Sequence, residues 1–359
     1  MKIFITGATG QLGHSLIREL IKGDMLSINS PQEIVCLVRN PEQAGNLHDM
    51  NITIVQGTLK DKNYLKHILS EHKIDIIFHC AAISNPSADK ELLFSTNIDG
   101  SNNLLDAFVE SPQTHSFVFS SSISVYDSYL KSDGTPLTED AKFGSLTKGD
   151  PYAISKRMIE QEITHLQKLH PEKRFYIARI GPMSGTHDRI ILPMLITLMS
   201  KQRLPKLIGK GRKKISIIAP EDAARAMVFL TQNSKKDSNH VYNVTGNMIS
   251  YKEMFDCVAS YYGIEYSNFS IPYWLFRILR PIIWLIRIFF PKNKFVQMVF
   301  SETALAFFNN SYEYDSNKIQ NLGFKFLYSP LESIRMGLET MDHEKELIAS
   351  KQDNCKTDN

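Results

Sequence analysis

Tyr152 and Lys156 are the residues of this chain whose types and spacing point most directly to chemistry. Side chains four residues apart share one face of an α-helix, so the segment YAISK predicts a phenol beside an ammonium group. A free phenol has a pKa of about 10, and a neighbouring cation lowers that pKa by favouring the phenolate. The pair therefore predicts proton transfer to or from a substrate hydroxyl or carbonyl group. The alternative is an ordinary pair on the surface of an amphipathic helix.

A run of serines, Ser120–Ser122, follows a predicted strand that begins at Ser116. Ligands of doubly wound sheets bind at the carboxyl ends of the strands, so a hydroxyl group there could hold a reacting oxygen while Tyr152 moves the proton. Serines in this position also satisfy the backbone groups of turns. We expect one serine to take part in the chemistry and the others to have that structural role.

A glycine-rich segment, GATGQLG, follows the apolar residues 3–6 and opens a predicted helix. Glycines allow a tight turn and let backbone N–H groups approach a pyrophosphate at the start of the helix. A plain strand-to-helix turn is the alternative. The residues expected to bind the dinucleotide here are Gly7, Thr9, Gly10, Gln11, Leu12 and Gly13.

The end of the second predicted strand bears on the choice of cofactor. An NAD site usually has an acidic residue there, which accepts a hydrogen bond from the ribose 2′-hydroxyl group. This chain has Arg39 instead, and a guanidinium group matches a 2′-phosphate in charge and geometry. The sequence therefore favours NADP over NAD. The alternative is that Arg39 points to solvent or stacks on the adenine of NAD.

The elements that must position these groups alternate between strands and helices up to about residue 180. The expected strands are residues 3–6, 33–38, 52–56, 75–79, 116–120 and 175–180, and the expected helices are 11–22, 62–71, 91–110 and 151–169. This alternation predicts an α/β fold built on a Rossmann-type, doubly wound parallel sheet.

The alternation loosens in the second half, where we expect helices at 190–200, 220–231 and 251–262 and a strand at 240–244. We expect a dinucleotide-binding Rossmann domain at 1–180, which the chain re-enters near residues 215–262. We expect a smaller, mostly helical substrate-binding region at 181–340. Residues 341–359 are polar and charged, and are expected to form a flexible tail.

Composition limits the class of protein. A net charge of +3 over 359 residues, without a basic run interleaved with aromatics, argues against nucleic-acid binding. The four cysteines are far apart, which indicates neither a metal site nor a disulfide framework and fits a cytoplasmic setting. The apolar run at the N-terminus is too short for a signal peptide, so we expect it to be the first strand.

The segment at residues 271–291, IPYWLFRILRPIIWLIRIFFP, has nearly the length of a membrane span. Three arginines and Pro281 within it disfavour a span, because arginine is costly at the centre of a bilayer. The arginines share one face of a predicted helix, which is typical of amphipathic helices that lie in the membrane interface. A helix that covers a substrate pocket with its apolar face is the interpretation that we favour, with peripheral membrane association as the alternative.

The ordered set of motifs resembles the extended short-chain dehydrogenase/reductases, the group of NAD-dependent epimerase/dehydratases, 3β-hydroxysteroid dehydrogenases and dihydroflavonol reductases. The resemblance covers about residues 1–340. Its motifs are GATGQLG, LVRN, HCAA at residues 79–82, STNIDGSNNLLDA with Asn97, FSSSISVY, YAISK, RIGPMSG, ISIIAPEDAARA and VYNVTG.

The resemblance implies roles for individual residues. It makes Ser122 the catalytic serine, Tyr152 the proton donor and acceptor, and Lys156 its partner, which also contacts the nicotinamide ribose. It implies cofactor contacts for Thr58, Leu59, Ala81, Ala82, Asn97 and Pro182. Thr58 departs from the pattern, because relatives commonly have Asp there. Many relatives dimerise through the helices at 91–110 and 151–169, so a homodimer is implied.

Two reactions remain open, together with a non-catalytic, NADP-sensing role that the intact Ser122, Tyr152 and Lys156 disfavour. The first reaction, favoured by Arg39 and the apolar C-terminal segment, is NADP-dependent interconversion of a ketone and an alcohol on a hydrophobic, steroid-, lipid- or polyketide-like substrate. The alternative is a nucleotide-sugar epimerase or dehydratase, in which the basic residues of 206–214 would hold a diphosphate. Dehydratases of this group usually have Asp-Glu directly after the catalytic hydroxyl group, where this chain has Ile123 and Ser124.

Overall fold

The computed structural model describes residues 1–85, 88–126, 135–141, 143, 150–200, 207–233, 240–266, 270–290 and 313–357. A seven-stranded sheet with the order β3-β2-β1-β4-β5-β6-β9 dominates it, and every neighbouring pair in this sheet is parallel. Its strands are β1 (Ile3–Thr6), β2 (Ile34–Val38), β3 (Thr53–Gln56), β4 (Ile76–His79), β5 (Ser116–Ser122), β6 (Arg174–Ile180) and β9 (Val241–Val244).

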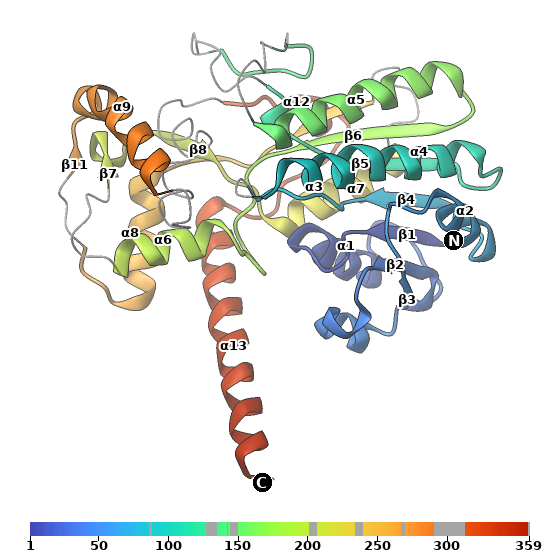
Figure 1. Cartoon of the computed structure of the whole chain (residues 1–359), viewed down its shortest axis with the longest axis horizontal. Coiled ribbons are helices and arrows are strands. Elements are labelled where there is room, and N and C mark those ends of the chain that lie inside the picture. Colours follow the sequence, from blue (N-terminus) through green and yellow to red (C-terminus); the bar gives the residue numbers. More distant parts are fainter. Residues whose placement is uncertain are drawn as a thin grey trace.

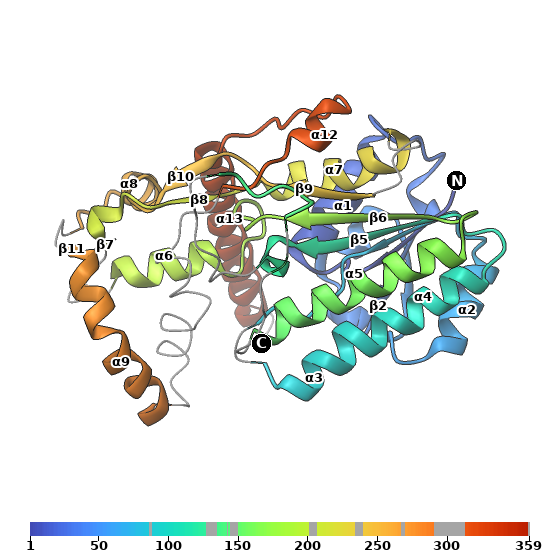
Figure 2. The same cartoon turned by 90° about the horizontal axis from the view of Figure 1, so that it is seen from above.

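Helices cover both faces of this sheet (Figures 1 and 2). One face carries α1 (Gln11–Lys22) and α7 (Pro220–Asn233), and the other carries α2 (Lys62–Glu71), α4 (Gly100–Glu110) and α5 (Pro151–Leu169). Along β1, Ile3 and Ile5 enter the first core and Phe4 enters the second, as expected for alternating side chains buried on both faces. The Rossmann-type α/β fold predicted from the sequence is confirmed.

The expected helix at 91–110 is interrupted. It consists of α3 (Lys90–Phe94), a single π-helical turn at Ser95–Asp99, and α4. A π turn inserts one residue into the helical repeat, and such insertions occur often at functional sites. Here the turn contains Asn97, one of the predicted site residues.

A second, mostly helical region has its own apolar core, which includes Leu192, Phe255 and Ile334. Its elements are α6 (Ile191–Ser200), β7 (Leu207–Ile208), β8 (Lys214–Ser216), β10 (Met248–Ser250), α8 (Tyr251–Tyr262), β11 (Ser270–Ile271), α9 (Tyr273–Phe289) and α13 (Pro330–Thr357). The short helix α12 (Asn317–Asn321) packs beside β9.

The polar segment expected to form a flexible tail is helical in the structure as far as Thr357. Residues 341–357 continue α13, since they contain neither glycine nor proline and include two glutamates and three lysines, which are good helix formers. Pro281 lies within α9. Within the described ranges, none of the helices combines the length and the apolar character needed to cross a membrane. Lys206, Pro291 and the last two residues lie outside those ranges.

Candidate active site

The glycine turn between β1 and α1 has no room for larger residues at two positions. A Cβ atom on Gly7, whose φ is 75°, would lie 2.6 Å from the backbone nitrogen of Ala81, and one on Gly13 would lie 2.2 Å from the carbonyl oxygen of Gly7. Gly10 is the N-cap residue of α1 and makes no side-chain cap, so the cap itself supplies no acceptor for the first N–H groups of that helix. Close packing together with a helix start that has no side-chain cap fits a dinucleotide pyrophosphate.

The other predicted residues of this turn differ in what they can contribute. Thr9 and Gly10 are exposed, whereas the Leu12 side chain is buried in the core, so only the backbone of Leu12 could contact a cofactor. The Gln11 side chain donates from Nε2 to the carbonyl oxygen of Thr186 at 3.0 Å. Gln11 therefore connects the start of α1 to the segment that follows β6.

Arg39, Thr58 and Leu59 follow the carboxyl ends of β2 and β3, on the same edge of the sheet as the glycine turn. Arg39 and Thr58 are exposed, while Leu59 is buried against α4, where a Cβ on Gly100 would lie 2.8 Å from its own Cβ. Arg39 is thus placed where an adenosine ribose lies in sheets of this type.

The segment after β4 is fixed by Asn97. Asn97 accepts from the backbone N–H of Ile83 at 2.8 Å, and its Nδ2 donates to the carbonyl oxygen of Ile83 at 3.0 Å and to the Ser155 hydroxyl at 3.1 Å. Ala81 and Ala82, both half-buried, directly precede Ile83. Because its polar atoms are engaged with the protein, Asn97 acts as a positioning residue that joins the Ala81–Ile83 segment to α5.

Ser122 and Tyr152 lie together at the ends of β5 and α5. A hydrogen bond with the Ser122 side chain lowers the pKa of Tyr152, but burial has the larger effect and raises this pKa to about 12. The Ser122 hydroxyl also accepts from the backbone N–H of Ser124 at 3.2 Å. The sequence predicts that Lys156 lowers the pKa of Tyr152, whereas in this structure Lys156 is not among the groups that shift that pKa, and burial keeps the phenol protonated at neutral pH.

The position of the Lys156 ammonium group explains this difference. Its Nζ donates to the carbonyl oxygen of Ser120 at 2.5 Å and lies 4.5 Å from the centroid of the Phe119 ring, whereas the centroid of the Tyr152 ring is 5.7 Å away. Burial lowers the pKa of Lys156 to about 8, and Cys80 and Glu160 oppose that shift. Lys156 is therefore anchored to β5 and still mostly charged at pH 7.

Pro182 is half-buried just beyond β6, and its carbonyl oxygen accepts from the N–H of Ile218 at 3.0 Å. Parallel strands end at one edge of a sheet, so Pro182 lies on the same side as Ser122 and Ala81. The predicted residues that directly follow strands therefore lie along one edge of the sheet, whereas Tyr152 and Lys156 lie on α5 and Asn97 lies in the π turn before α4.

A buried chain of hydrogen bonds that the sequence did not predict starts at β1. The Thr6 hydroxyl lies 2.6 Å from Nδ1 of His79, and Nε2 of His79 lies 2.8 Å from Oγ of Ser101. Ser101 donates to the carbonyl oxygen of Asn97 at 2.6 Å, so His79 donates from Nε2 and accepts at Nδ1. Burial lowers the pKa of His79 to about 3, which keeps the imidazole neutral. His79 belongs to the HCAA motif, but its link to Thr6 and Ser101 requires the fold.

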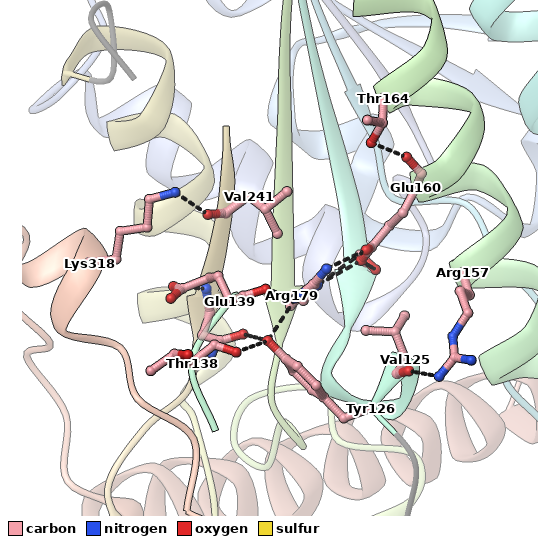
Figure 3. A network of polar contacts seen from close by, with 12 residues as sticks. Val125, Tyr126, Thr138, Glu139, Arg157, Glu160, Thr164, Arg179, Val241 and Lys318 are labelled. Atoms are coloured by element: carbon pink, nitrogen blue, oxygen red, sulfur yellow. Dashed lines mark hydrogen bonds and ion pairs between the residues drawn. The ribbon is translucent and has the colours of Figure 1, made fainter. Parts of the chain in front are cut away.

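A second missed network surrounds Arg179 (Figure 3). Arg179 donates from Nη2 to Glu160 at 2.8 Å and from Nη1 to the hydroxyl of Tyr126 at 2.8 Å. Tyr126 in turn donates to Oδ1 of Asn243 on β9 at 2.7 Å. Glu160 is four residues beyond Lys156, a spacing that could have placed it on the same face of α5. The network joins α5 to β6 and β9.

The comparisons agree with this architecture. The model of the NAD dependent epimerase/dehydratase family matches residues 3–245. The chain belongs to this family.

Curated relatives match about half of the chain. It is 30% identical to a UDP-glucose 4-epimerase of Neisseria meningitidis serogroup B over 52% of this chain and 54% of the relative. It is also 30% identical to one of Pisum sativum over 52% of this chain and 53% of the relative. The chain thus spans about half the length of these relatives.

Solved structures match over nearly the full length. A UDP-glucose 4-epimerase of Thermotoga maritima with UDP-glucose has a TM-score of 0.70 at 18% identity, covering 96% of this chain and 99% of that one. A dTDP-glucose 4,6-dehydratase of Streptomyces venezuelae with NAD bound has a TM-score of 0.73 at 18% identity, covering 97% and 98%. At these identities the likeness concerns the fold.

Proposed function

We propose that this chain is a nicotinamide-dependent nucleotide-sugar epimerase, which oxidises a secondary hydroxyl group of its sugar and then reduces the resulting ketone. The observation that carries the proposal is the contact between Ser122 and Tyr152, with Lys156 one helical turn away, on the sheet edge that bears the glycine turn. The UDP-glucose 4-epimerases among the relatives support this substrate class. They support it better than they support the steroid-, lipid- or polyketide-like substrate that the sequence favours.

In this proposal each residue has one task. Ser122 holds the reacting oxygen, and Tyr152 exchanges a proton with that oxygen through its hydroxyl group. The Lys156 ammonium, one helical turn from Tyr152, would donate to the ribose of the bound nicotinamide nucleotide. A bound nicotinamide supplies the acceptor for the hydride in the oxidation and returns it in the reduction. The glycine turn and Arg39 would hold the dinucleotide, and the second, mostly helical region would hold the nucleotide sugar.

Epimerisation is favoured over dehydration within this substrate class. A dehydration needs additional acid-base groups beside the catalytic serine. Ile123 follows Ser122 and is buried, and Ser124 comes next, so neither side chain is an acid.

A second candidate is an NADP-dependent reductase that acts on a hydrophobic ketone. Arg39 favours this reductase, because an exposed guanidinium group at the end of β2 suits the 2′-phosphate of NADP. An epimerase, in contrast, regenerates its dinucleotide in every catalytic cycle. The two candidates differ in stoichiometry. The reductase consumes one NADPH per product, and the epimerase consumes none.

The test uses the purified full chain. The dinucleotide released on denaturation is identified by mass spectrometry, and UDP-glucose is then incubated with the protein without added cofactor. We expect UDP-galactose to form, and Tyr152→Phe to reduce the rate by about 10²–10⁴-fold. Tyr261→Phe on α8 is the matched control and should keep the rate. NADPH consumption with ketones, and no conversion of UDP-sugars, would favour the reductase; full activity of Tyr152→Phe would contradict both candidates.

A further inference from the structure

Helix α9 exposes an apolar stripe that nothing in the proposed chemistry uses. The stripe consists of Trp274, Ile278, Ile282, Leu285 and Phe289, which are 63%, 63%, 52%, 45% and 75% exposed. Their spacing of four, four, three and four residues places them on one face of the helix. Single exposed apolar residues are ordinary on protein surfaces, whereas a continuous stripe of large ones marks an interaction site.

The body of the protein holds this helix in place at its start. Strand β11, directly before α9, pairs with β7 in parallel register. Leu275, Leu279 and Ile286 are half-buried, so α9 has an inner side distinct from the stripe. In both views α9 lies at the end of the molecule opposite to α2 and α4 (Figures 1 and 2).

The charged residues in and around α9 indicate which kind of partner fits the stripe. Residues 266–301 contain five basic residues, Arg277, Arg280, Arg287, Lys292 and Lys294, and no acidic residue. A helix with an exposed apolar stripe in a purely cationic segment complements an anionic phospholipid surface, where acyl chains take the stripe and headgroups attract the cations. Trp274 suits the boundary between these two layers.

The length of α9 favours a helix that lies on a membrane over a helix that crosses it. Its 17 residues extend over about 26 Å, and Pro281 lies in the middle. A helix of this kind lies in the plane of the interface. We propose that α9 docks this protein on anionic phospholipid membranes, with its apolar stripe inserted among the lipids. This inference is independent of the proposed function.

The experiment is co-sedimentation of the full chain with vesicles of phosphatidylcholine alone and of phosphatidylcholine with phosphatidylserine at about 7:3. We expect binding to the vesicles that contain phosphatidylserine, weakened at high salt because headgroup attraction is screened. The variant Ile278→Asp/Ile282→Asp should bind to the vesicles that contain phosphatidylserine at least about tenfold more weakly than the wild type. The control Leu327→Asp/Leu331→Asp adds the same charge at side chains that are 59% and 38% exposed, and should bind like the wild type.

Circular dichroism and urea unfolding establish that both variants are folded. Binding of the α9 variant equal to that of the wild type would overturn the proposal, as would a lack of preference for phosphatidylserine. Light scattering without lipid adds a further outcome. If the wild type ignores vesicles but self-associates, and Ile278→Asp/Ile282→Asp abolishes that association, the stripe binds a second copy of the chain and the membrane proposal is wrong.

Discussion

Glu160 on α5 and Arg179 on β6 form an ion pair with an N–O distance of 2.8 Å, and each of the two side chains is 5% exposed. Glu160 also accepts from the Ser121 hydroxyl at 2.5 Å, and Arg179 donates to the carbonyl oxygen of Glu139 at 3.0 Å. The pair therefore fixes the helix that carries Tyr152 and Lys156 against the strands of the sheet.

Removal of one member of this pair should be strongly destabilising. Glu160→Ala leaves the Arg179 guanidinium buried without its counter-ion, and we expect a loss of about 3–5 kcal/mol in the free energy of unfolding. The control is Asp106→Ala, which removes a 2.7 Å ion pair with Lys62 whose side chains are 47% and 36% exposed, and should cost far less because solvent screens exposed charges. Urea unfolding measures both. Equal losses for the two variants would contradict a dominant role for burial.

Much of the fold could be predicted because it depends on local patterns. The bounds of α1, α2, α5 and α8 match the sequence-based prediction. The Gly7–Gly13 turn has the close backbone contacts that its glycines imply. These features follow from hydrophobic periodicity and from backbone freedom at glycine, and both can be read from neighbouring residues.

The features that were missed depend on contacts between distant residues. Spacing placed Tyr152 and Lys156 on one face of α5, but it could not show that the ammonium group would turn to the carbonyl oxygen of Ser120, 36 residues away. The partners of His79 are 73 and 22 residues away, on β1 and α4. Periodicity also gave no sign of the π turn around Asn97, because a single inserted residue hardly changes the apolar pattern.

His79 should make the protein sensitive to acid. Its pKa in the folded chain is about 3, below the ordinary 6.5, so the unfolded chain takes up a proton first as the pH falls. The contribution of neutral His79 to the free energy of unfolding is therefore present above about pH 6.5 and is lost progressively as the pH falls toward 3. Between pH 6.5 and pH 5 this amounts to about 2 kcal/mol.

The variant His79→Gln tests this, because it removes the titrating group. It should be less stable than the wild type at pH 7, since the contacts with Thr6 and Ser101 are altered, but should lose about 2 kcal/mol less between pH 6.5 and pH 5. His67→Gln, at a ring that is 66% exposed, is the control and should keep the wild-type dependence. An unchanged acid sensitivity in His79→Gln would assign this sensitivity to other groups.

Gly13→Ala should disrupt the dinucleotide site. The new Cβ would lie 2.2 Å from the carbonyl oxygen of Gly7, so α1 must shift away from the turn, at a cost of about 1–3 kcal/mol. We expect at least tenfold less co-purified dinucleotide, measured by mass spectrometry. Gly10→Ala, with a milder contact of 3.2 Å, should fold and still bind less.

The matched control for the glycine variants lies at the other end of α1. Gly23 has a φ of +73°, and a Cβ at this position would meet no atom within 4 Å, so Gly23→Ala strains the backbone by about 1 kcal/mol but leaves the turn unchanged. It should retain its dinucleotide. Equal dinucleotide loss in Gly23→Ala and Gly13→Ala would show that stability, and not the geometry of the turn, controls binding.

Lys156→Met should separate activity from stability. Burial lowers the pKa of Lys156 from 10.5 to about 8, so holding its charge at pH 7 costs the folded state about 3 kcal/mol. The methionine removes that cost and loses one hydrogen bond to Ser120, worth about 1 kcal/mol. We therefore expect the variant to be about 2 kcal/mol more stable at pH 7 while its epimerase rate falls by about 10²–10⁴-fold.

The expected gain in the free energy of unfolding of Lys156→Met should depend on pH, and this dependence tests its cause. The unfolded chain holds the Lys156 proton up to about pH 10.5 and the folded chain only to about pH 8, so wild-type stability rises relative to Lys156→Met across that window. The advantage of the variant should be constant below pH 8 and disappear near pH 10. Lys173→Met is the control, because Lys173 is also buried and donates to the carbonyl oxygens of Ser111 and Thr114, away from the site, so its removal should leave the rate unchanged. A destabilised Lys156→Met at pH 7 would mean that the bond to Ser120 outweighs the cost of burying the charge.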